Sequence, residues 1–163
     1  MALQILIGCH ILAGLAAVIL GAMTMFARKA PGRHPRRGRR YLVALGAVFV
    51  TGTAIATTNW AHLWHLATTG LVAVACATTG YLAHRIQWRG WLWTHIPAMT
   101  GSYTAMLTAF YVDNGPRLPV WNLLPAVTFW FLPTAVAVPL LVRALRKYAG
   151  KTGTILDSRE QIP

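Results

Sequence analysis

Long apolar stretches separated by short polar segments dominate the chain. Residues 41–84, 90–112 and 118–142 contain no Lys, Arg, Asp or Glu, and residues 3–26 are equally free of charge. A helix needs about 20 apolar residues to cross a hydrocarbon layer of about 30 Å. The pattern therefore predicts helices that span a membrane.

The stretch from 41 to 84 is too long for one crossing, and Asn59-Trp60 divides it in two. We therefore expect an all-α integral membrane bundle of five transmembrane helices, over residues 3–26, 41–58, 61–83, 91–112 and 118–142, which together form one domain (1–142). A basic tail follows over 143–163. The fifth span contains Pro125, Pro133 and Pro139, which remove backbone donors and predict a kinked helix.

The cations predict how the bundle is oriented. Of the fifteen Lys and Arg residues, fourteen fall on one side of the five-span arrangement, and Arg117 falls on the other. Because short cytoplasmic loops carry the excess of Lys and Arg, the N-terminus is expected outside and the C-terminal tail in the cytoplasm.

Composition narrows the class of protein. Hydrophobic residues make up 56% of the chain and charged residues 11%, against roughly 25% charged in soluble domains. The net charge is +12, with carboxylates only at Asp113, Asp157 and Glu160. This excludes an ordinary soluble domain and catalysis by paired carboxylates within the apolar part, and no catalytic residue is assigned. The cations flank the spans, so we expect a lipid bilayer rather than nucleic acid as the partner.

Six histidines are the candidates for chemistry, because an ionisable group inside a membrane is by default a functional candidate. On the outer side, His10, His62 and His65 are predicted at similar depth, with His62 and His65 on one helix face. On the inner side, His95 lies one turn into its span and is a candidate to meet His84 or His34.

Two chemistries fit these groupings. Histidines on neighbouring helices clamp haem iron, so His10 with His65, and His95 with His84, are candidate haem b ligands. The triad of His10, His62 and His65 is a candidate zinc or copper site. Simple placement at the headgroups remains open for the histidines near the two surfaces.

A basic segment joins the first two spans. Its charged or titratable residues are Arg28, Lys29, Arg33, His34, Arg36, Arg37, Arg39 and Arg40. Each cation near the surface is worth about 1 kcal/mol of attraction to anionic phospholipids. Topology and lipid attraction explain the segment, and docking of an acidic partner or anionic ligand is the alternative.

The chain resembles a widespread family of small bacterial multi-pass membrane proteins of unknown function. The likeness rests on His10, Gly14 and Gly21, on a segment that reads His34-Pro35-Arg36-Arg37-Gly38-Arg39-Arg40-Tyr41, and on His95 ahead of Ser102-Tyr103. Pro35 stands where the family pattern has Arg. The resemblance implies a bacterial inner-membrane bundle in which His10, His34 and His95 are functionally important. An architectural likeness to membrane b-type cytochromes rests on histidines near both surfaces.

Three functions follow as expectations. The first is an accessory or assembly subunit of a larger membrane complex or homo-oligomer, suggested by small outer loops and a basic inner face. The second is electron transfer through haem b or a His-bound metal. The third is a small-molecule carrier or sensor, which needs a polar cavity around His95, Asn122 or Thr128 and a moving fifth span.

Overall fold

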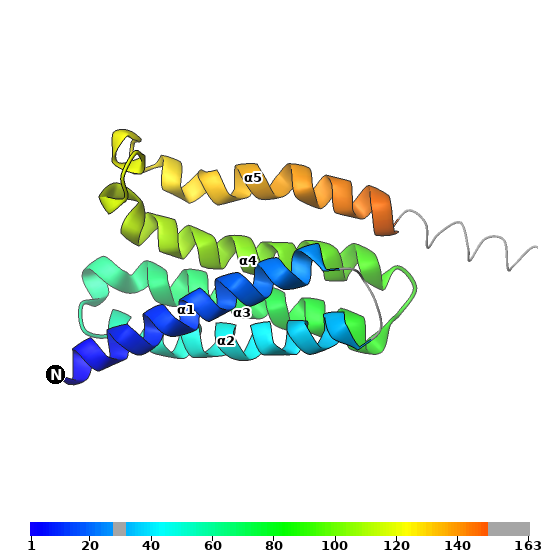
Figure 1. The fold of residues 1–163 in the computed structure, drawn as a ribbon, viewed down its shortest axis with the longest axis horizontal. Helices are drawn as coiled ribbons and strands as arrows, with labels where there is room; N and C mark the ends of the chain where they lie inside the picture. Colours follow the sequence, from blue (N-terminus) through cyan, green and yellow to red (C-terminus); the bar gives the residue numbers. More distant parts are fainter. Residues whose placement is uncertain (28–31, 150–163) are drawn as a thin grey trace, which may run out of the picture.

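The computed structural model describes residues 1–27 and 32–149, and this part of the chain is helical without strands (Figure 1). The long helices are α1 (Ala2–Phe26), α2 (Arg33–Ala56), α3 (Trp60–Ile86), α4 (Trp91–Asn114) and α5 (Thr128–Ala144). One π-helical turn, Leu145–Ala149, extends α5. The all-α prediction is confirmed.

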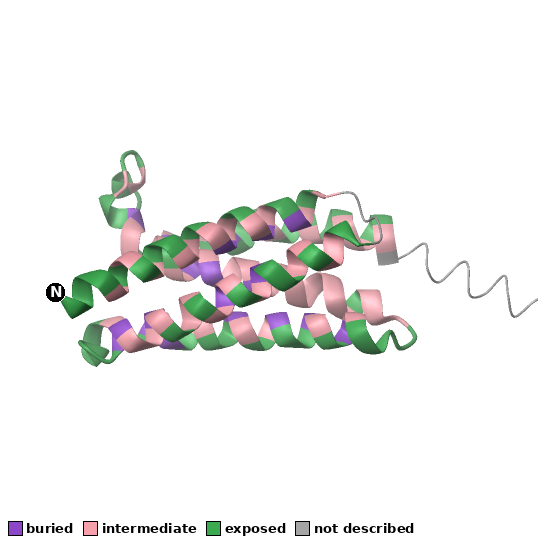
Figure 2. Ribbon diagram, turned by 60° about the horizontal axis from the view of Figure 1, so that its bottom comes forward, coloured by how far each residue is buried: buried purple, intermediate pink, exposed green. Residues whose placement is uncertain are grey.

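The helices run up and down, and neighbours in the sequence pack together. α3 packs against both α2 and α4, α1 lies along α2, and α5 lies along α4. The central core consists of Ala17, Tyr41, Leu45, Ala73, Ala77 and Met106. Half of these residues are alanines, which let helix backbones approach closely where lipid removes most of the hydrophobic drive. Figure 2 shows the buried residues facing the bundle interior, whereas the outward faces are largely exposed.

Within the described residues, four helical segments are long and apolar enough to cross a membrane: Ala2–Phe26, Arg33–Ala56, Trp60–Ile86 and Thr128–Tyr148. α4 is not among them, because its sequence includes His95, Ser102 and several threonines. It nevertheless packs between α3 and α5 over a similar length.

α2 and α3 are separated where the sequence predicts the second and third spans to be divided. α2 ends at Ala56, and α3 begins at Trp60 with Asn59 as its N-cap residue. The backbone N–H groups of Thr58 and Asn59 bond to carbonyl oxygens of α2, so the connection is a tight turn. Such a short link forces α2 and α3 to be antiparallel neighbours.

Two other boundaries differ from the sequence prediction. α2 begins at Arg33, ahead of the predicted span over 41–58, so most of the basic segment is helical rather than a loop. Pro35 lies in the first turn, where its missing N–H costs little.

α5 begins at Thr128, later than the predicted span over 118–142. Two short 3-10 turns, Gly115–Arg117 and Trp121–Leu123, occupy part of the intervening chain. Pro125 therefore precedes the helix, whereas Pro133 and Pro139 lie inside it. Pro97 is also interior to its helix.

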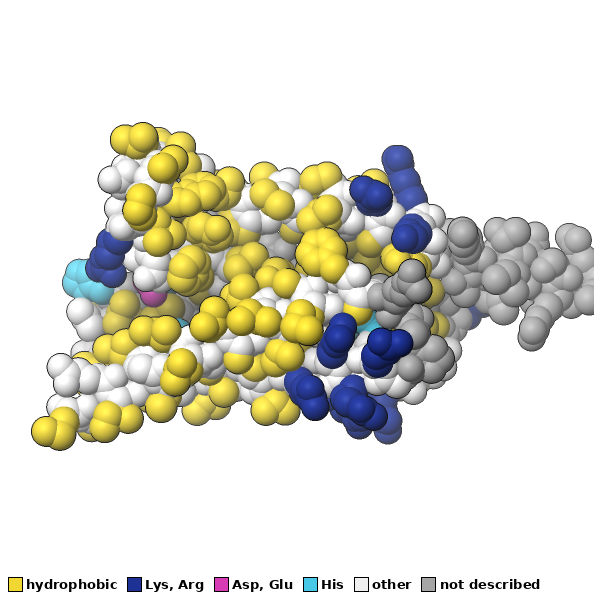
Figure 3. Space-filling model, viewed as in Figure 1, with side chains coloured by type: hydrophobic (Ala, Val, Ile, Leu, Met, Phe, Trp, Pro, Cys, Tyr) yellow, Lys and Arg dark blue, Asp and Glu magenta, His cyan; other side chains and the backbone are white. Residues whose placement is uncertain are grey.

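Positive charge gathers at one end of the bundle. Among the eleven Lys and Arg residues that the structure describes, ten lie at the end where α2 and α4 begin and α1, α3 and α5 finish. Arg117 lies at the other end, beside the tip of α4. Figure 3 shows this contrast directly. The charge separation expected from the sequence is present in these residues.

Candidate functional site

His10 joins α1 to α2 within the bundle. Its Nδ1 lies 2.9 Å from Oγ1 of Thr51. The Thr51 hydroxyl is 2.7 Å from the carbonyl oxygen of Ala47, to which it donates, so the ring nitrogen of His10 is the donor toward Thr51. Gly52 lies beside the ring, and a Cβ added there would be 3.1 Å from Cε1 of His10. Nδ1 of His10 is therefore engaged in a side-chain hydrogen bond between α1 and α2.

His65 has a different partner. Its Nε2 donates to Oδ1 of Asp113 at 2.7 Å, which connects α3 to the end of α4. The ring of Trp130 on α5 packs edge-on to His65, with ring centroids 6.3 Å apart. His65 is buried, with 8% of its surface exposed. Three helices thus meet at this histidine.

The predicted outer grouping of His10, His62 and His65 is not brought together as a metal site. His62 is exposed and contacts Asn59, with Nδ1 3.1 Å from Oδ1. Within residues 1–27 and 32–149, no three His, Cys, Asp or Glu side chains gather in a way that holds a metal ion. The metal and haem hypotheses gain no support from this part of the structure.

The histidines that the sequence predicts on the inner side do come together. The ring of His95 on α4 lies 5.6 Å from that of His84 on α3 and 6.4 Å from that of His34 on α2. Trp91 completes the cluster, with its ring 5.3 Å from His84 and 5.5 Å from His95. Nδ1 of His95 donates to the carbonyl oxygen of Gly80 at 2.8 Å. We call these four residues the inner histidine cluster.

The basic segment borders this cluster. Its described members all lie on the first turns of α2: Arg33, His34, Arg36, Arg37, Arg39 and Arg40. Arg28 and Lys29 lie outside the described residues. The arginines therefore project from a helix end, close to the place where His34 meets His95.

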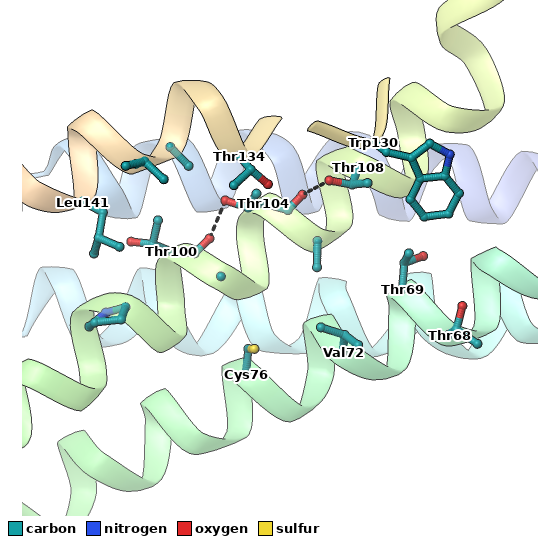
Figure 4. Close-up of a pocket in the computed structure, with 15 residues that line it drawn as sticks. Thr68, Thr69, Val72, Cys76, Thr100, Thr104, Thr108, Trp130, Thr134 and Leu141 are labelled. Atoms are coloured by element: carbon teal, nitrogen blue, oxygen red, sulfur yellow. Dashed lines mark hydrogen bonds between the residues drawn. The ribbon is translucent and has the colours of Figure 1, made fainter. Parts of the chain in front are cut away.

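A groove of about 460 Å³ opens between α3, α4 and α5. Figure 4 shows threonines arranged along it, with Trp130 at one end. The threonines that line it are Thr68, Thr69, Thr100, Thr104, Thr108 and Thr134. The hydroxyls of Thr104 and Thr108 donate to carbonyls one turn earlier, at 2.9 and 3.0 Å. Their oxygens keep acceptor capacity toward the groove.

The groove differs from the cavity that the carrier hypothesis requires. His95, Asn122 and Thr128 are not among the residues that line it. Its walls are instead the threonine faces of three helices, together with Cys76 and several small side chains. The sequence showed an abundance of threonine without indicating that six of them share one groove.

Sequence reasoning also missed a buried polar contact at the bundle centre. The hydroxyl oxygens of Tyr41 and Ser102 lie 2.8 Å apart, and both residues are almost fully buried. Tyr103 donates to the carbonyl oxygen of Val18 at 3.1 Å. Together these bonds connect α4 to α2 and α1. The motif resemblance includes Tyr41 and Ser102-Tyr103, and this was the available signal.

The contact of Asp113 is also not predicted from the sequence, because this residue lies just beyond the predicted span over 91–112. It belongs to the last turn of α4, where it meets His65. Comparisons with known proteins add no further assignment: no family model, no curated protein and no solved structure matches the chain.

Proposed function

We propose that this chain is a five-span protein of the bacterial inner membrane, with its N-terminus outside, that serves as an accessory or assembly subunit of a larger membrane complex. Four apolar helical segments and the one-sided charge support the membrane placement. α4 crosses with its neighbours because it packs between α3 and α5. The resemblance to small bacterial multi-pass proteins supports the choice of membrane.

The threonine-lined groove is the observation that most supports a role as a subunit. α5 packs along α4, and the groove lies between it and α3. Alanine and glycine residues let a further helix approach closely in lipid, and threonine hydroxyls exchange hydrogen bonds with it. A transmembrane helix of a partner is therefore the occupant that this surface suits.

Site-directed photocrosslinking tests the assignment. A benzophenone amino acid replaces Ala137, which lines the groove, or Val43, which is 75% exposed on α2 and does not line it. In illuminated whole membranes we expect a defined protein adduct from position 137 and none from position 43. Mass spectrometry then identifies the partner or a second copy of the chain. Equal protein adducts at both positions, or none at position 137, contradict the proposal.

The groove volume favours a second candidate, a carrier or sensor of a small lipid-soluble molecule. Its volume of about 460 Å³ falls within the roughly 300–1,000 Å³ of small-molecule sites. Pro133 and Pro139 within α5 weaken that helix at the groove wall. The same experiment separates the two candidates, because a small-molecule ligand adds a discrete low mass at position 137 instead of a protein.

A further inference from the structure

The inner histidine cluster places three imidazoles from three different helices at the positive end of the bundle. Every described ionic charge at that end is positive, since Asp113 lies at the opposite end. The ring of His95 lies 5.6 Å from that of His84 and 6.4 Å from that of His34. At these separations one anion placed against the cluster accepts N–H groups from more than one ring.

The helix ends reinforce the same charge preference. α2 and α4 both begin at this end, with His34 and His95 in their early turns. Neither helix has a side-chain cap or an acidic residue in its first turn, and the N-cap residues are Gly32 and Gly90. Helix starts carry partial positive charge and favour an anion, and here the described chain supplies none.

Trp91 suits a lipid headgroup in particular. Its ring packs against two of the three histidines, and tryptophan is enriched at the membrane–water interface. All four cluster residues are partly exposed, so a headgroup reaches them from the interface. A phosphate group supplies both the negative charge and several acceptor oxygens.

We propose that His34, His84 and His95 form a binding site for a phosphate group, presented by the headgroup of an anionic phospholipid. The site is distinct from the threonine-lined groove and does not depend on the accessory-subunit assignment. The arginine-rich segment attracts anionic lipid in general, whereas the proposed site holds one headgroup at a defined place, the three histidines. Nδ1 of His95 is engaged with Gly80, so His95 contributes through its Nε2 edge when protonated.

The test measures lipid binding to the delipidated full chain in detergent by native mass spectrometry. Phosphatidylglycerol is the anionic probe, and phosphatidylcholine is the zwitterionic comparison. We expect the His34→Asn, His84→Asn double variant to lose about tenfold in affinity for phosphatidylglycerol, as removal of hydrogen bonds to a charged group predicts. His62→Asn changes a histidine at the opposite end and is the matched control. Unchanged affinity in the double variant overturns the proposal.

Competition with inorganic phosphate identifies the source of the phosphate group. If millimolar phosphate does not displace phosphatidylglycerol, the lipid is the ligand. In the other outcome, phosphate displaces the lipid from the wild type but not from the sites that remain in the double variant. In that case, free phosphate binds at the three histidines as well as the lipid headgroup.

Chemical footprinting tests the same proposal on the wild-type protein, so the result does not depend on whether a variant folds. Diethylpyrocarbonate modifies accessible imidazoles, and the modified residues are located by mass spectrometry. Phosphatidylglycerol is expected to slow modification of His34 and His84 at least threefold and to leave His62 unchanged. Equal rates at His34 and His84 with and without the lipid overturn the proposal.

Discussion

The Nε2 atom of His65 lies 2.7 Å from Oδ1 of Asp113, and this contact ties α3 to the end of α4 at the less charged end of the bundle. Asp113 is the one carboxylate within the described residues. The ring of Trp130 packs edge-on against His65, which brings α5 to the same point. The pair therefore closes this end of the bundle beside the threonine-lined groove.

Removing this pair should destabilise the protein. His65→Ala leaves the Asp113 carboxylate without its partner, and a lost hydrogen bond to a charged group costs about 1.5–3 kcal/mol. Thermal unfolding in detergent should show a clearly lower midpoint for His65→Ala than for the wild type. His62→Ala, which alters an exposed histidine three residues away, is the control. Equal midpoints for the two variants would contradict the importance of the pair.

The buried contact between Tyr41 and Ser102 predicts an energetic coupling. Tyr41→Phe should cost about 0.5–1.5 kcal/mol, because it removes the partner of a buried hydroxyl. Ser102→Ala should cost a similar amount. The double variant should cost less than the sum of the two, since neither polar group is then left unpaired. Strict additivity in the three unfolding measurements would show that the hydroxyls do not interact.

Two glycines on α1 predict opposite outcomes for the same substitution. A Cβ at Gly21 would lie 2.5 Å from the ring of Tyr103, whereas one at Gly14 meets nothing within 4 Å. Gly21→Ala should therefore cost about 1–3 kcal/mol through overpacking. Gly14→Ala should leave stability unchanged or raise it, because alanine favours the helix. Similar unfolding midpoints for both variants would refute the close contact.

Much of the architecture was predictable because hydropathy and charge act over whole segments. The break at Asn59 and the separation of cations depend on residues close together in sequence, and both appear in the structure. The grouping of His95 with His84 and His34 followed from depth alone, since these residues lie at one end of three adjacent helices.

The rest depended on contacts between distant residues or on backbone detail. The sequence analysis places the basic segment between two spans, yet a proline in a first turn, such as Pro35, is compatible with the helix that begins at Arg33. His65 and Asp113 are 48 residues apart, and depth matching alone favoured His10 as the partner. The rotation of each helix about its own axis determines whether His65 faces His10 or Asp113, and hydropathy does not reveal that rotation.

The central claim is that five helices cross the membrane with the arginine-rich end in the cytoplasm. Cysteine labelling in intact spheroplasts tests it most directly, in a background with Cys9 and Cys76 replaced by serine. Asn122→Cys lies beyond the C-terminal end of α4 and Arg89→Cys in the turn between α3 and α4, and both positions are exposed. We predict that a membrane-impermeant maleimide labels position 122 at once and position 89 only after permeabilisation. The reverse order, or labelling of both positions in intact spheroplasts, would contradict the account.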